Sequence, residues 1–129
     1  MDARTLLGMA LGMLLLDIGW LTLRNDSHKT LFQAIQGSPI QPRWIPALLI
    51  YVLIPVAVYL VAVQGSLDQT TTLQRSALVG LFLYAFYDLT NYATFTNWTL
   101  SMTLTDIAWG TALCTVGGLI GYWIQSQTI

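Results

Sequence analysis

The chain has 129 residues and a net charge of −1; 55% of its residues are hydrophobic and only 9% are charged. Soluble domains carry roughly a quarter charged residues, so this composition is typical of an integral membrane protein. The length fits one domain over residues 1–129. A near-neutral chain has no basic patch for nucleic acid, and the single cysteine excludes an internal disulfide or a thiolate metal cage.

The first apolar stretch covers residues 5–23 and is bracketed by Arg4 and Arg24. Its beginning resembles the apolar region of a signal peptide. However, Asp17 and Trp20 stand where small residues of a cleavage site would be expected. We therefore expect this stretch to be a membrane span.

Three further stretches have the length of a membrane-spanning helix, which takes about 20 residues. They cover residues 44–63, 76–95 and 100–124. The sequence thus predicts an all-α integral membrane four-helix bundle with short loops. Four spans place both termini on one side of the membrane, here called side A. The connections 24–43 and 96–99 then lie on the other side, side B, where a small excess of basic residues favours the cytoplasm.

Three aspartates interrupt the apolar stretches: Asp17, Asp88 and Asp106. Counting about 1.5 Å of rise per residue from the nearest span ends puts each of them about 10–12 Å below side B. Carboxyl groups are costly in hydrocarbon, and they normally face a bundle interior or a wet cavity. The spacing therefore predicts one polar chamber that opens toward side B.

Helical spacing predicts the rest of this chamber. Tyr84 and Asn91 share a helix face with Asp88, and Trp109 follows Asp106 by three residues. The predicted ligand-binding residues are Asp17, Asp88, Asp106, Asn91, Tyr84 and Trp109. The same groups also fit a purely structural role, in which acids, tyrosines and amides hydrogen-bond between helices at about 1 kcal/mol each.

Two glycine pairs with a spacing of four lie toward side A: Gly8 with Gly12, and Gly117 with Gly121. Small residues at this spacing let helix backbones approach closely in a membrane. We expect these four glycines to pack helices tightly at side A. Proline in the second span, at Pro46 and Pro55, is tolerated in membranes and would bend the helix, which widens the bundle at side B.

Other residues argue against a cofactor. The only histidine, His28, and the only lysine, Lys29, both lie outside the spans, so haem or zinc ligation by histidine and a retinal Schiff base lack support. Three aspartates would suit only a hard cation such as magnesium, and we expect no metal site. Four tryptophans near span ends are expected to anchor the chain at the membrane interfaces. These are Trp20, Trp44, Trp98 and Trp123.

The third and fourth stretches carry a recognisable pattern. It reads Tyr87-Asp88-Leu89-Thr90-Asn91, then Ala93-Thr94, Trp98 and Asp106-Ile107-Ala108-Trp109-Gly110, and it is joined by Asp17-x-x-Trp20-Leu21. With these residues the chain resembles the predicted membrane proteins of domain-of-unknown-function family 2177, which occur largely in bacteria. The resemblance implies a four-helix integral membrane protein, and it places the signature on Asp17, Asp88, Asn91, Asp106, Trp109 and Gly110. It implies no particular activity.

These observations leave three functional hypotheses open. The first is binding or movement of an apolar or amphipathic small molecule in the chamber, with Asp88 and Asn91 in direct contact. The second is an accessory subunit of a homo-oligomer or a larger membrane complex. The third is an acid–base enzyme acting on a lipid or isoprenoid, with one carboxyl as proton donor and another as base. In each case membrane lipid is the expected surrounding, and a bacterial cytoplasmic membrane the expected location.

Overall fold

The computed structural model of the chain describes residues 2–127. This part of the chain is helical and contains no strand, so the all-α class is as predicted. Its elements in chain order are α1 (Ala3–Leu23), α2 (Asn25–Gln36), α3 (Trp44–Val58), the π-helical segment η1 (Tyr59–Val63), α4 (Gln69–Thr94) and α5 (Leu100–Ser126).

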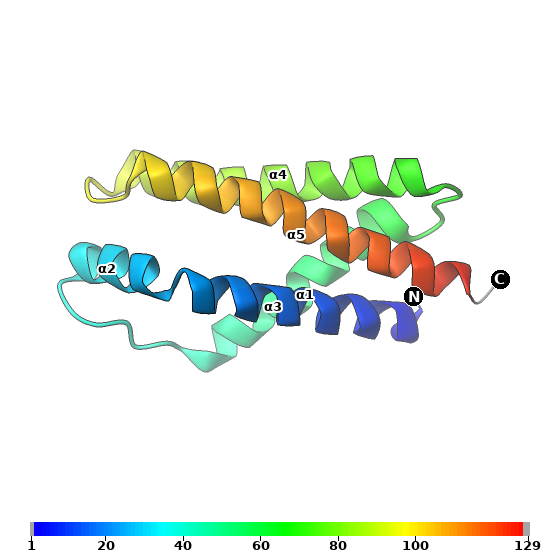
Figure 1. Cartoon of the computed structure of the whole chain (residues 1–129), viewed down its shortest axis with the longest axis horizontal. Coiled ribbons are helices and arrows are strands. Elements are labelled where there is room, and N and C mark those ends of the chain that lie inside the picture. Colours follow the sequence, from blue (N-terminus) through cyan, green and yellow to red (C-terminus); the bar gives the residue numbers. More distant parts are fainter. Residues whose placement is uncertain (1, 128–129) are drawn as a thin grey trace.

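The helices form an elongated bundle (Figure 1). Helices α1, α4 and α5 follow its long axis, whereas α3 crosses obliquely behind them. The start of α1, the end of α5 and the turn before α4 lie at one end of the bundle, which corresponds to side A. The short helix α2 and the hairpin between α4 and α5 lie at the other end, which corresponds to side B.

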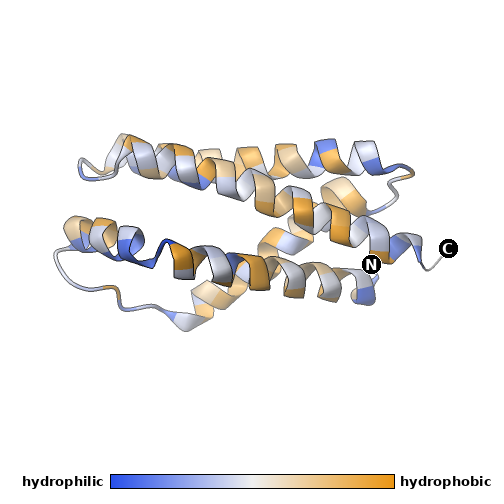
Figure 2. Cartoon of the chain, viewed as in Figure 1, coloured by the Kyte–Doolittle hydropathy of each residue, from blue (hydrophilic) through white to orange (hydrophobic). Residues whose placement is uncertain are grey.

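Among residues 2–127, three elements are long and apolar enough to cross a membrane: α1, α3 continued by η1 (Trp44–Val63), and α5. Helix α4 has 26 residues but is less apolar, because Tyr84, Tyr87, Asp88 and Asn91 lie within it. The sequence predicts a four-helix bundle with four spans, whereas residues 2–127 contain five α-helices, and α4 is less apolar than the three span candidates. Figure 2 shows the same difference, with hydrophilic residues gathered at the start of α4 and in the connections.

The outer surface of the bundle is apolar, as a membrane environment requires. Leu15 on α1, Ile45 on α3 and Phe86 on α4 are exposed to 69%, 76% and 78%. Soluble monomers rarely expose contiguous apolar patches larger than a few hundred Å². This surface fits contact with lipid chains.

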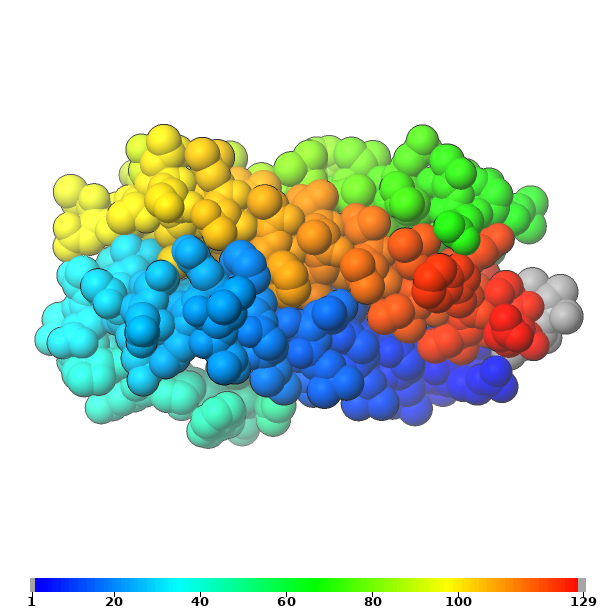
Figure 3. Space-filling model, viewed as in Figure 1, coloured from blue at the N-terminus to red at the C-terminus, as the bar shows by residue number. Residues whose placement is uncertain are grey.

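The prediction of a polar connection over residues 24–43 is wrong for residues 25–36, which form α2. Leu31, Phe32 and Ile35 recur at helical spacing in this segment, and a glycine in the left-handed conformation, Gly37, ends the helix. Residues 25–36 are polar on average, and for this reason they were not predicted to form an amphipathic helix. Figure 3 shows α2 lying beside the hairpin and the start of α5 at the side B end.

The hairpin holds α2 in place. Leu31 is buried against Trp98 and Met102, and the Asn97 side chain donates a 3.1 Å hydrogen bond to the carbonyl oxygen of Ala34. Trp98 was expected to be an interface anchor, but its side chain is 5% exposed and belongs to this cluster. Helix α2 thus covers the side B end of the bundle.

Helix α4 begins at Gln69, before the predicted span 76–95, because Asp68 caps it. The Asp68 carboxylate accepts hydrogen bonds from the Thr71 amide at 2.7 Å and from the Thr71 hydroxyl at 2.8 Å. These bonds, first the one from the amide, lower the pKa of Asp68 below its usual value. The cap satisfies amide groups of the first turn that have no partner within the helix.

The tightest packing of α1 lies toward side A and involves the four predicted glycines. A Cβ atom at Gly117 would lie 2.4 Å from the Met13 sulfur, and one at Gly121 would lie 2.5 Å from the Met9 sulfur. In the opposite direction, Cβ atoms at Gly8 and Gly12 would meet Ile124 and Ile120 of α5. Side chains from each helix thus fill the space left by glycines of the other.

A second set of glycines joins α4 to α5 and was not singled out as a packing device in the sequence. A Cβ atom at Gly80 would lie 2.5 Å from the carbonyl oxygen of Gly110. One at Gly110 would lie 2.0 Å from the Tyr84 ring, and one at Gly118 would lie 1.8 Å from the Ser76 hydroxyl. These two helices therefore approach each other backbone to backbone.

Candidate functional site

The site is built around Asp17, two thirds of the way along α1. Its carboxylate accepts a 2.6 Å hydrogen bond from the Tyr51 hydroxyl of α3 and a 2.9 Å hydrogen bond from the Trp109 indole N–H of α5. One side chain thus connects three helices. Both partners are uncharged donors, so neither of them pairs the Asp17 carboxyl group with an opposite charge.

Trp109 is held from a second direction by Trp20. The two indole rings stack with centroids 4.6 Å apart and planes 4° from parallel. The Arg24 guanidinium lies 5.6 Å from the Trp20 ring centroid. Trp20, expected to be an interface anchor, is therefore part of a stack that begins at Arg24 and ends at Trp109, next to Asp17.

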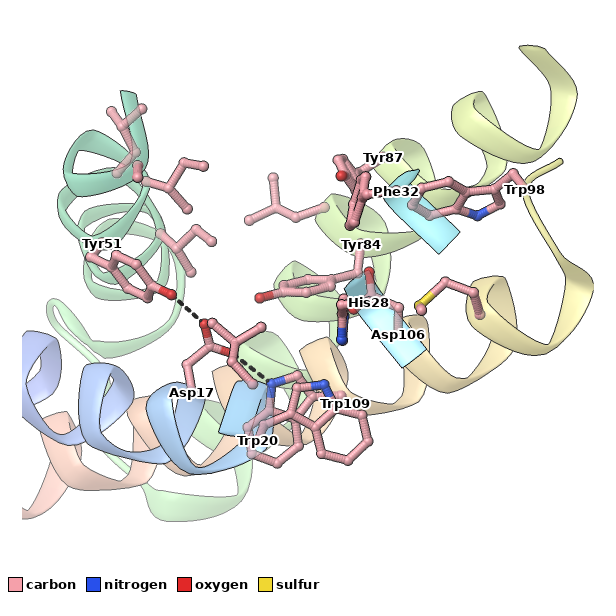
Figure 4. A pocket seen from close by; sticks show the side chains of 17 residues that line it. Asp17, Trp20, His28, Phe32, Tyr51, Tyr84, Tyr87, Trp98, Asp106 and Trp109 are labelled. Carbon is pink, nitrogen blue, oxygen red and sulfur yellow. Dashed lines mark hydrogen bonds between the residues drawn. The ribbon is translucent and has the colours of Figure 1, made fainter. Parts of the chain in front are cut away.

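A pocket of about 500 Å³ lies beside Asp17. Pockets for small molecules commonly measure about 300–1,000 Å³ and combine apolar walls with a few polar groups. Figure 4 shows Tyr51 and Tyr84 projecting from opposite sides, with Asp17 and Trp109 below them. The lining residues come from all five α-helices and the hairpin: Asp17, Trp20, Leu21, His28, Phe32, Ala47, Ile50, Tyr51, Leu53, Ile54, Leu83, Tyr84, Tyr87, Trp98, Met102, Asp106 and Trp109.

The side B end of the pocket is aromatic. Trp98 meets Phe32 of α2 edge-on at 5.7 Å between ring centroids, and it meets Tyr87 of α4 in the same way at 6.1 Å. His28 of α2 also lines the pocket, and its Nδ1 lies 2.9 Å from the carbonyl oxygen of Arg24. Helix α2 thus contributes both an aromatic and a titratable side chain to the site.

The pocket also reaches the outer surface of the bundle between α3 and α4. Ile50 and Leu53 of α3, and Leu83 of α4, line it and are nevertheless 50%, 62% and 42% exposed. The η1 segment packs against α4, whereas α3 itself touches α4 much less, so the two helices separate toward side B. The opening faces the same apolar surface that fits lipid.

Four of the six predicted site residues line the pocket: Asp17, Tyr84, Asp106 and Trp109. Asp88 and Asn91, the residues expected to make direct contact, are not among the lining residues. The pocket side of α4 is formed by Leu83, Tyr84 and Tyr87. Asp88 lies about 100° further around the helix than Tyr87, and it is buried against Asp106 of α5.

Asp88 is completely buried, and neither oxygen of its carboxyl group has a hydrogen-bond partner. Its interacting neighbour is the Asp106 carboxyl group of α5. The prediction that three acids line one chamber therefore needs correction: Asp17 and Asp106 line the pocket, and Asp88 lies behind Asp106. Within residues 2–127, no three metal-ligating side chains lie together as a metal ion would require.

The sequence reasoning missed Tyr51, His28 and Phe32. Tyr51 had a usable signal, because it is the only residue of α3 with a hydroxyl group, in the same half of the membrane as Asp17. His28 and Phe32 lie in the segment that was predicted to be a loop, so they could be placed in the site only once this segment was seen to form α2. An amphipathic helix that directly follows a span, as α2 follows α1 at Arg24, can pack its apolar face against the end of the bundle.

Comparison with known proteins adds one finding. Residues 3–123 match the model of a family described as "Predicted membrane protein (DUF2177)". No curated protein and no solved structure matches the chain.

Proposed function

The chain belongs to the predicted membrane protein family DUF2177, and from this premise we propose that it crosses the membrane four times and binds an apolar or amphipathic small molecule in the pocket. A bacterial cytoplasmic membrane is the location that fits this proposal. The pocket beside Asp17 is the observation that carries it. The polar contacts would be Asp17 and Asp106, with Tyr51 and Tyr84 beside them.

The packing of α4 supports its role as the fourth span. With 26 residues it is about 39 Å long, which exceeds the roughly 30 Å hydrocarbon core. Asp88, the acidic residue of α4, is buried, whereas Phe82 and Phe86 are 65% and 78% exposed. An average over all residues therefore understates how apolar the outer face of α4 is.

The open space beside Asp17 supports a ligand-binding role of the aspartates over a role only in joining helices. If the aspartates served only to join helices, the space between them would be closed by side chains. Instead Asp17 is oriented by Tyr51 and Trp109 at the edge of a cavity of about 500 Å³. The opening at Ile50 and Leu53 lets a lipophilic molecule enter from the membrane without crossing water.

Filling the pocket tests the proposal. Ala47 lines the pocket on α3, so the Ala47→Trp variant should occupy much of its volume. Native mass spectrometry of the wild-type protein, purified in a mild detergent, should show a bound small molecule. The adduct should fall at least about tenfold in the variant, since a steric block costs more than about 1.4 kcal/mol of binding free energy.

The matched control is Ala112→Trp, which places the same side chain on the exposed face of α5. The control should keep the adduct. Equal adducts in wild type and both variants would place the bound molecule outside the pocket and contradict the proposal. A constant additional mass of a second protein chain, without a small molecule, would instead favour the accessory-subunit hypothesis.

The enzyme hypothesis has one observation in its favour, namely two carboxyl groups in the same pocket. Asp17 and Asp106 both line it, and general acid–base chemistry needs a proton donor and an acceptor near the substrate. Binding remains the proposal that the geometry supports best, because the two carboxyls do not by themselves specify a reaction.

A further inference from the structure

The charge distribution of the pocket narrows the class of molecule that it can bind. Its lining contains two aspartates and one histidine, and neither arginine nor lysine. Charged groups in apolar surroundings are normally paired with an opposite charge. The pocket lining therefore contains more acidic than basic side chains.

In the part of the chain that the structure describes, Asp17 and Asp106 have no positively charged side chain among their contacts that would balance them. Asp17 is bound by the Tyr51 hydroxyl and the Trp109 indole, which are both uncharged. Asp106 faces a third acidic group, the fully buried Asp88 carboxyl, so this contact adds no positive charge. Arg24 lies against Trp20 and is not part of the lining.

The remaining walls favour positive charge as well. Tyr84, Tyr87 and Trp98 line the pocket, whereas the Trp20 ring, also in the lining, is already in contact with Trp109 and with the Arg24 guanidinium. The faces of aromatic rings carry partial negative charge, and they attract organic cations by about 0.5–2 kcal/mol per contact, most strongly when the cation is desolvated. An anionic head group would meet the carboxyl groups and these ring faces without a compensating lysine or arginine.

We infer that the pocket selects lipophilic cations, such as protonated or quaternary amines with apolar substituents, over anionic molecules of the same shape. This inference rests on the proposed function and adds the charge of the ligand. The apolar part would lie between α3 and α4, near Ile50 and Leu83. The positive centre would lie between Asp17 and Asp106.

Two probes of nearly equal shape and opposite charge test this inference. Tetraphenylphosphonium is a lipophilic cation, and tetraphenylborate is the corresponding anion. Binding of each to the protein in nanodiscs of neutral lipid is measured by equilibrium dialysis, with empty nanodiscs subtracted. We expect the wild-type protein to bind the phosphonium at least about tenfold more tightly than the borate.

Variants locate the selectivity in the pocket. Asp106→Asn should weaken phosphonium binding at least about fivefold, because it removes a charge that faces the cation. Asp17→Asn should act in the same direction and serves if Asp106→Asn does not fold. Asp26→Asn is the matched control, since Asp26 is an exposed aspartate of α2 outside this pocket, and it should leave both affinities unchanged.

Three results would overturn the inference. The first is equal or tighter binding of the borate. The second is phosphonium binding that persists in Ala47→Trp, which would place the cation elsewhere. The third is binding of neither probe while native mass spectrometry still detects a pocket-dependent adduct. In that last case the proposed function stands and only the preference for cations fails.

Discussion

The Gly80→Ala variant is expected to lose about 1–3 kcal/mol of unfolding free energy. The added Cβ atom would lie 2.5 Å from the Gly110 carbonyl oxygen and 2.9 Å from the Thr111 α-carbon. Both are backbone atoms of α5, so no side chain can rotate away and α4 must move as a whole. Unfolding in detergent micelles at increasing fractions of sodium dodecyl sulfate measures this loss.

The control for this variant is Gly19→Ala on α1, where a Cβ atom would meet no atom within 4 Å. Gly19→Ala should leave the unfolding free energy unchanged or raise it slightly, since alanine favours helix over glycine. If Gly80→Ala were as stable as this control, the backbone contact between α4 and α5 would not exist as described.

The Asp17→Ala variant is also expected to lose about 1–3 kcal/mol of unfolding free energy. It leaves the Tyr51 hydroxyl and the Trp109 indole N–H without their acceptor, in surroundings where water does not replace it easily. The loss should appear as a lower unfolding free energy in the same assay and as a changed environment of the Trp109 fluorescence.

A double-mutant cycle with Tyr51→Phe separates the contribution of the hydrogen bond between Tyr51 and Asp17 from other effects of the Asp17→Ala substitution on stability. Removing the Tyr51 hydroxyl should cost stability in the wild-type background and much less in the Asp17→Ala background, because the bond is already absent there. Additive costs would show that Tyr51 and Asp17 do not interact, and the geometry of the site would then be wrong.

Much of the helical arrangement could be predicted from the sequence, because apolar length is a strong signal. Residues 5–23, 44–63 and 100–124 coincide closely with α1, α3 continued by η1, and α5. Helix α4 begins before the predicted span 76–95, because hydropathy indicates the apolar part of a helix and not its first turns. The Asp68 cap begins the helix in the polar segment that precedes the span.

The site was predicted only in part, and the reason is rotation about the helix axis. Counting residues from span ends gives the depth of a side chain, and depth placed the three aspartates at one level. It does not give the direction in which a side chain points. Asp17 and Asp106 line the pocket, whereas Asp88 is buried against Asp106 of α5, a contact that counting residues does not give.

The parts of the site on α2 and α3 could not be read from hydropathy at all. Helix α2 is too polar to appear as a span, and its role depends on the contact of Leu31 with Trp98. Tyr51 is a single polar residue in an apolar helix, and nothing in its neighbours indicates that it reaches Asp17. Tertiary packing, more than local sequence, places these side chains.

The central claim is that a lipophilic molecule occupies the space between Asp17 and Asp106. The most direct test is an experimental structure of the protein in lipid nanodiscs with tetraphenylphosphonium. We predict density for the cation between these two carboxyl groups, with Tyr51 still bound to Asp17. A structure in which α3 closes against α4 and side chains fill this space, with the cation absent, would contradict the claim.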